Sequence, residues 1–286
     1  MLEKVTLGKS TIKTLRRLRR LPSASTQVRA ITAHDGAMFS EIIQSPVAQM
    51  WSNVVFVYLK YLNLELDFGL LAIFPSLATL HCQTMTLRLG RPEYTFLALQ
   101  LFEMFDSTVS GSPEDVQAVF SAATMPSIRS LTLDVEPGPD LNYEQTFRNL
   151  FPQITSLALI GNGSEPDYSH LTPYLPLMPR LAHLLLDNDL CYLPEFLAAI
   201  PTPVKLDSFH LLWEDASFGK DNPYSDVIIA IAPQDEGANI RARRVYLYVG
   251  PDRFLREVPD LPPHARFVKD WPSWHDIHGT LRRSPL

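Results

Sequence analysis

The sequence predicts an α/β fold in which short strands and short helices alternate along the chain and stack into a curved solenoid. Two observations predict it: a recurring pattern of a bulky apolar residue, a proline and a strand, and a nearly constant spacing between copies. The 24 prolines against 12 glycines fit a chain in which helices are stopped repeatedly. In such a solenoid a parallel β-sheet lines the concave side, and short helices and turns line the convex side.

The clearest copy of the repeat is residues 125–133, Met-Pro-Ser-Ile-Arg-Ser-Leu-Thr-Leu. Similar stretches begin at Phe74, Phe151 and Met178, and a looser copy begins at Ile200 with three extra residues. In each copy the proline ends a short helix, because it has no N–H and restricts the residue before it. An L-x-x-L-x-L strand then begins, with side chains alternating between the core and the opposite face.

The apolar residue that opens each strand pattern, here called the anchor, sets the period. Successive anchors are 51, 26, 27 and 25 residues apart, in the order Leu77, Ile128, Ile154, Leu181 and Leu206. The first interval is about twice the others, which predicts one degenerate repeat inside it. Residues 54–59 and 28–31 fit the same phase upstream. A period of about 20–29 residues with this strand pattern is the signature of leucine-rich repeats, although an ordinary α/β domain also alternates strands and helices.

The repeats are expected to fill residues 28–250, between two caps. Residues 1–27 predict an amphipathic basic helix, Lys9 to Arg20, that covers one open end of the solenoid. A mitochondrial presequence or a nuclear import signal would also explain its arginines. Residues 251–286 are expected to fold over the other end and to bury Phe267, Trp271 and Trp274.

Local signals predict the remaining elements. Ser112-Pro113 and Asn142 are expected to begin helices that run to Ala123 and Leu150, and residues 67–74 to form another. Residues 84–89 predict a second strand, and residues 243–249 the last one. The apolar residues of 94–105 stand at helical spacing, which predicts a helix there. That spacing is carried by Leu97, Leu101, Phe102 and Phe105.

Composition excludes several classes of function. The 286 residues are 46% hydrophobic and carry a net charge of −6, which is typical of a folded domain and argues against nucleic acid as a partner. No apolar run is long enough to span a bilayer, so no membrane partner is expected. Cys82 and Cys191 are expected to be buried free thiols, which predicts a cytoplasmic or nuclear protein.

No known catalytic or cofactor motif is present, so neither an enzyme, a cofactor nor a metal site is expected. His275 and His278, with His264 nearby, lack the supporting ligands of a zinc site. Residues 161–163, Gly-Asn-Gly, predict a turn and not a dinucleotide loop. An enzyme whose site assembles only in three dimensions stays open as an alternative.

Strand alternation predicts which side chains lie on the concave face. If Leu131 and Leu157 point into the core, aspartate should unfold the chain at either position, while Thr132→Asp should be tolerated. Acids gather where strands end, at Asp134 with Glu136, Asp187 with Asp189, and Glu214 with Asp215, and form either a partner-facing rim or ordinary loop surface. The candidate binding face comprises Tyr58, Lys60, His81, Thr132, Asp134, His183, Asp187, His210, Tyr246 and Tyr248.

The repeat units, together with residues 245–249 (Val-Tyr-Leu-Tyr-Val), residues 252–255 (Asp-Arg-Phe-Leu) and Trp271, resemble the irregular leucine-rich-repeat region of fungal, mushroom-type F-box-like proteins. The resemblance covers most of the chain from about residue 28. It implies that the repeats recognise a protein target, and that an F-box ahead of them binds the Skp1 adaptor of a cullin ubiquitin ligase.

The chain departs from this family at its start. The stretch of about 27 residues before the first candidate repeat is rich in arginine and lacks the opening of an F-box. We therefore expect a protein-recognition module, the target-binding region of an F-box-like substrate receptor. The alternative is a stand-alone leucine-rich-repeat scaffold or regulator that does not contact Skp1.

Overall fold

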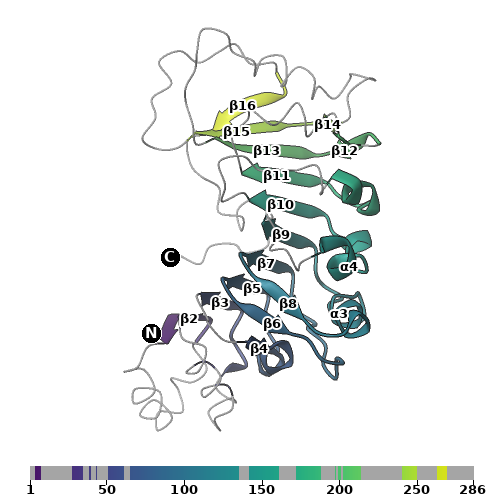
Figure 1. The fold of residues 1–286 in the computed structure, drawn as a ribbon. Helices are drawn as coiled ribbons and strands as arrows, with labels where there is room; N and C mark the ends of the chain where they lie inside the picture. The colour runs from purple at the N-terminus through teal and green to yellow at the C-terminus, as the bar shows by residue number, and fades with distance from the viewer. Residues whose placement is uncertain are drawn as a thin grey trace. The chain divides into compact units, whose positions relative to one another are not determined.

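The computed structural model describes residues 4–7, 28–34, 39, 43, 51–60, 65–134, 142–160, 172–187, 197, 199–200, 202–213, 240–249 and 263–268. The chain divides into two compact units, Met1–Ile154 and Thr155–Leu286. Figure 1 shows strands arranged side by side in each unit, with few helices. In the described part of the chain no helix is both long and apolar enough to cross a membrane.

Unit 1 contains a parallel sheet of six strands. Its order follows the sequence: β1 (Lys4–Leu7), β2 (Ala30–Ala33), β3 (Phe56–Lys60), β5 (Thr79–Gln83), β7 (Leu101–Phe105) and β9 (Ser130–Asp134). A second, three-stranded parallel sheet is formed by β4 (Glu65–Asp67), β6 (Thr86–Arg88) and β8 (Thr108–Ser110). Each sheet takes one strand from successive stretches of chain, because parallel neighbours need a crossover connection between them.

Unit 2 is built on the same plan. Its main sheet has the parallel order β10 (Ser156–Ile160), β11 (His183–Asp187), β13 (Ser208–Trp213), β15 (Val245–Val249) and β16 (Ala265–Val268). The short strands β12 (Val204–Leu206) and β14 (Ile240–Ala242) pair separately. The predicted α/β class with a large parallel sheet is therefore confirmed.

The predicted helices begin where their caps stand. In α3 (Pro113–Val119) the side chain of Ser112 accepts a hydrogen bond from the Asp115 N–H at 3.1 Å, and in α4 (Tyr143–Phe147) Asn142 caps in the same way. Helix α3 ends at Val119, four residues before the predicted end. Three further segments are short 3₁₀ helices: η3 (Phe68–Ile73), η4 (Phe151–Gln153) and η5 (Thr172–Leu177).

Six successive anchors, from Val54 to Leu181, are held by the same tight turn. The anchor N–H donates to the carbonyl of the bulky residue three places earlier, in Trp51–Val54, Phe74–Leu77, Phe96–Leu99, Met125–Ile128, Phe151–Ile154 and Met178–Leu181, at 3.0 to 3.4 Å. The proline of the motif occupies the second position of this turn, where its fixed φ is favoured and no N–H is needed.

A second bond pattern links each repeat to the one before it. The two residues after an anchor both donate their N–H groups to the carbonyl that follows the preceding anchor. Ala78 and Thr79 thus share the Val55 carbonyl, at 2.9 Å each, and Gln100 and Leu101 share that of Ala78. In unit 2 the Thr155 carbonyl accepts from Ala182 and His183.

The core lies beneath the anchors and the inward-facing strand residues. Leu77, Ile128, Ile154, Leu181 and Leu206 are all buried, and so are Leu131 and Leu157, as alternation predicted. Aromatic rings fill the space between the main sheet and the helical side of unit 1. The Phe68 ring lies against those of Phe96, Phe102 and Phe120, with centroids 5.2 to 6.3 Å apart.

The helix predicted over residues 94–105 is wrong, because residues 101–105 form strand β7. Hydrogen bonding to β5 on one side and β9 on the other outweighs a helical spacing of apolar residues. Leu97, which the helix would have buried, is 68% exposed. Strand β7 is the degenerate repeat that the long first interval required.

Two end regions also differ from expectation. Lys4–Leu7 is a strand that pairs with Ala30–Ala33, so residues 1–27, expected to form a cap, contribute a strand to the sheet. Residues 243–249 do not hold the last strand, because β16 follows β15. The helix predicted at Lys9–Arg20, the burial of Phe267, Trp271 and Trp274, and Cys191 lie outside the described residues or side chains.

Candidate recognition face

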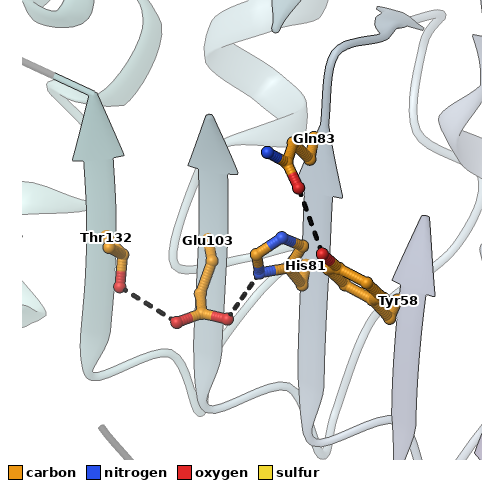
Figure 2. Close-up of polar contacts among 5 residues, drawn as sticks. All are labelled: Tyr58, His81, Gln83, Glu103 and Thr132. Atoms are coloured by element: carbon orange, nitrogen blue, oxygen red, sulfur yellow. Dashed lines mark hydrogen bonds and ion pairs between the residues drawn. The ribbon is translucent and has the colours of Figure 1, made fainter. Parts of the chain in front are cut away.

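Four side chains of unit 1 lie in one row across the sheet, opposite to the core. The register pairs Tyr58 of β3 with His81 of β5, His81 with Glu103 of β7, and Glu103 with Thr132 of β9. Because side chains alternate along every strand and the register is in phase, the four project from the same face (Figure 2). We call Tyr58, His81, Glu103 and Thr132 the polar row.

Hydrogen bonds join three members of the polar row, and the fourth, Tyr58, bonds to a residue beside the row. Nδ1 of His81 lies 2.9 Å from Oε2 of Glu103, and the Thr132 hydroxyl donates to Oε1 of Glu103 at 3.4 Å. The Tyr58 hydroxyl donates to Oε1 of Gln83 at 3.1 Å. Figure 2 shows these contacts running from one strand to the next. Because an ionised carboxylate only accepts hydrogen bonds, Nδ1 of His81 carries the proton that points at Glu103.

Aromatic rings enclose the His81 imidazole. The Tyr58 ring centroid lies 4.1 Å from that of His81, and the Phe105 centroid lies 4.9 Å from it. Nε2 of His81 is shielded from solvent and contacts no hydrogen-bond partner among the described residues. The polar row therefore contains one ring nitrogen whose bonding capacity is unused.

The row is not evenly open to solvent, and this corrects the expected exposure. Tyr58, Lys60 and His81 are partly exposed, but Thr132 is 0% exposed and Asp134 5% exposed. The prediction that Thr132 is solvent-facing and tolerates aspartate rested on alternation alone. Alternation gives the face of a side chain, whereas exposure depends on what packs over that face.

Asp134 is bound into the local structure. Its Oδ2 accepts a hydrogen bond from the Asp106 N–H at 3.2 Å, and its carbonyl accepts one from the Tyr143 hydroxyl at 2.6 Å. Burial, and next the charge of Asp134, raises the pKa of Tyr143, so the phenol stays a donor. The other members of the suggested acidic rim, including the Asp187 side chain, lie outside the described side chains.

Cys82 follows His81 on β5 and points to the other face, into the core, as a buried free thiol. Burial, with a smaller contribution from Glu103, raises the pKa of the Cys82 thiol. The thiol is therefore protonated and poorly nucleophilic at neutral pH. No trio of histidine, cysteine, aspartate or glutamate among the described residues is arranged to hold a metal ion.

Unit 2 carries a hydrogen-bonded chain on its own strands. The Ser208 hydroxyl lies 2.7 Å from Nδ1 of His183 and 2.7 Å from Nε2 of His210, and Nδ1 of His210 lies 2.8 Å from the Tyr248 hydroxyl. Burial, and next Tyr246, raises the pKa of Tyr248 to about 12. Burial lowers the pKa of His183, against a smaller opposing effect of Asp207.

Tyr246 stacks on His210 and also contacts Arg266. Its ring lies 4.7 Å from the His210 ring at an interplanar angle of 16°, and the Arg266 guanidinium lies 4.4 Å from the Tyr246 centroid. Tyr246, Tyr248 and His210 are buried at 9%, 5% and 4% exposure, so they too are less open than predicted. The Ser208–His210–Tyr248 order has the form of a nucleophile, a base and an orienting group, but all three side chains are buried.

The structure therefore brings the predicted residues together as two sets, Tyr58, His81 and Thr132 in unit 1, and His183, His210, Tyr246 and Tyr248 in unit 2. Sequence reasoning missed Glu103, because its segment was predicted helical. It also missed Gln83 and Arg266. Glu103 was recoverable: residues 96–104 repeat the pattern of 74–82 in phase, with Leu97 where proline stands.

Comparison of the chain with models of protein families, with curated proteins and with solved structures gave no match.

Proposed function

We propose that this chain is a protein–protein recognition module, built as a curved leucine-rich-repeat solenoid whose strand face contacts a protein target. Two features support the solenoid: the anchor turn recurs in six successive repeats, and the carbonyl after one anchor accepts from the next repeat. Nearest-neighbour bonding of this kind is what holds repeat arrays together.

The observation that carries the recognition role is the partly exposed patch of Tyr58, Lys60, His81, Gln83 and Phe105 on strands β3, β5 and β7. Tyrosine and other aromatic residues are enriched where proteins bind one another, because a ring buries a large area at a low cost in conformational entropy. The patch also carries polar groups that can orient a partner, which is the usual composition of a recognition surface.

By its resemblance to fungal F-box-like proteins, we place the module in a ubiquitin-ligase substrate receptor acting in the cytoplasm or nucleus, with Skp1 and a cullin as further partners. The buried free thiol of Cys82 is compatible with a reducing compartment. The stand-alone scaffold is the second candidate. It is favoured by β1, because residues 4–7 belong to the sheet and not to an adaptor-binding helix.

The test is affinity capture with the tagged chain from a fungal lysate, read by mass spectrometry, beside a Tyr58→Ala/Phe105→Ala double variant. Skp1 and a cullin captured by both forms, with a target captured only by the unsubstituted chain, would support the receptor. A reproducible target without Skp1 would favour the scaffold. Equal capture of every protein by the double variant would overturn the recognition role of this patch.

A further inference from the structure

The imidazole of His81 lacks one hydrogen-bond partner, whether the ring is neutral or protonated. When His81 is neutral and donates Nδ1–H to Glu103, Nε2 is a buried lone pair without a donor. When His81 is protonated, Nε2–H is a buried charged donor without an acceptor. An unsatisfied buried polar atom of this kind destabilises the fold and is uncommon in folded proteins. Its presence on a proposed binding face calls for a ligand group.

The charge around the pair favours a cation. Glu103 is 8% exposed, and among the described side chains it is bonded by His81 and Thr132, with no lysine or arginine in an ion pair. Buried carboxylates are normally paired with a positive charge. The Tyr58 and Phe105 rings on either side of His81 present π faces, which also attract cations.

We infer that the polar row of unit 1 receives a basic side chain, a guanidinium or ammonium group, from the protein partner. One N–H of that group donates to Nε2 of His81, and its positive charge offsets that of Glu103. The inference rests on the proposed function and names the chemistry of the contact. In the neutral ring, the hydrogen bond to Glu103 fixes the Nδ1–H tautomer of His81, which leaves Nε2 as the acceptor for the N–H of the basic group.

Access of a partner group to Nε2 of His81 requires the Tyr58 hydroxyl to leave Gln83 or the Phe105 ring to turn away. In Figure 2 the second ring nitrogen lies on the side of His81 away from the Glu103 carboxylate. Tyr58 and Phe105, whose rings contact His81, and Gln83, which bonds Tyr58, are all partly exposed. Such a change is a side-chain rotation and leaves the backbone pairing of β3, β5 and β7 in place.

The test uses N-acetyl-arginine amide as the probe and the ¹⁵N chemical shift of His81 Nε2 as the readout, assigned with His81→Asn. The full chain should show a saturable shift toward the value of a hydrogen-bonded nitrogen. Glu103→Gln should weaken binding of the probe at least tenfold. Glu114→Gln, which removes the same charge from an exposed position of α3, should not change it.

Two control probes show whether the polar row prefers a cation, an anion or a neutral amide. N-acetyl-aspartate amide and N-acetyl-glutamine amide should leave the Nε2 shift unchanged at the same concentrations. A shift with the aspartate probe alone would show an anion receptor, and would overturn the inference. So would a full chain whose Nε2 ignores the arginine probe. Either result leaves the proposed function standing if capture of a target still depends on Tyr58 and Phe105.

Discussion

Ser208 has one hydroxyl proton and two imidazole neighbours, so the directions of all the bonds in its chain are linked. If Tyr248 donates to Nδ1 of His210, then Nε2–H of His210 donates to Ser208, and Ser208 donates to His183. The raised pKa of Tyr248, about 12, keeps its phenol protonated over the whole neutral range and so keeps this direction available. Hydrogen bonds in such a chain polarise one another, which strengthens each of them.

His183, at one end of these hydrogen bonds, should make the stability of unit 2 depend on pH. Burial lowers the pKa of His183, so the folded state favours the neutral ring more than the unfolded state does. The stability that the neutral His183 ring contributes is fully present above about pH 6.5, the pKa of histidine in the unfolded chain. It is lost as the pH falls through the lower pKa of His183 in the folded chain. Urea unfolding from pH 8 to pH 4.5 should show a steeper loss for the unsubstituted chain than for His183→Asn. If both proteins lost stability equally as the pH fell, His183 would not be the source of the acid sensitivity.

Thr132 provides a second test at the scale of one residue. Thr132→Asp would place a second carboxylate in a fully buried position beside Glu103, where desolvation and like charge both act against it. We expect unit 1 to lose roughly 3 kcal/mol or more of unfolding free energy in urea titrations. Thr132→Val, which removes only the hydroxyl, should cost about 1 kcal/mol or less. An aspartate variant as stable as the valine variant would mean that this side chain reaches solvent.

At the scale of the element, the anchor turn explains why proline recurs in the sequence. A turn of this kind favours proline at its second position, and four repeats have it, at Pro75, Pro126, Pro152 and Pro179. The repeat that begins at Phe96 has Leu97 instead, and that exposed leucine obscured the repeat at the sequence level. Its turn bond, from the Leu99 N–H to the Phe96 carbonyl, is nonetheless made at 3.4 Å.

Leu97→Pro should therefore stabilise unit 1. The substitution restricts the unfolded chain at a position whose neighbours already use proline, which is worth about 0.4–1 kcal/mol. Thermal unfolding monitored by circular dichroism would measure the gain. Ala98→Pro is the matched control, because the four proline-bearing turns carry other residues at the third position, and proline there should destabilise. A Leu97→Pro variant that melts below the unsubstituted chain would show that this turn differs from the other four.

How far the elements could be predicted depends on how local their causes are. The caps at Ser112 and Asn142 act within one helical turn, so the helix starts are where the sequence places them. Strand β7 depends on pairing with two strands that are distant in sequence, and its apolar residues fit a helix equally well. The candidate site was the hardest part to predict, because Glu103, the buried carboxylate beside the His81 imidazole, lies in that strand.

At the scale of the whole molecule, the strand phase can be tested in each unit separately. Leu131→Asp and Leu157→Asp each bury an unpaired charge, and each should remove more than about 4 kcal/mol of stability. Hydrogen exchange read by mass spectrometry should place the loss of protection within residues 1–154 for the first variant and within residues 155–286 for the second. Leu97→Asp, at an exposed position, should leave both patterns unchanged. Equal loss in both units from either variant would mean that they unfold as one.

The bonds between repeats have a consequence for how the chain can change in length. Each carbonyl after an anchor serves the two N–H groups of the following copy, so the donor and acceptor sets are the same at every such junction of unit 1 from Arg29 to Ser130. If one entire copy were duplicated or deleted, the new neighbours would offer the same carbonyl and N–H groups, and every backbone group at the junction would keep a hydrogen-bond partner. A gain or loss of part of a copy would shift the phase and expose the core. Lineages that carry this chain should therefore differ by whole copies, with fractional insertions confined to the loops.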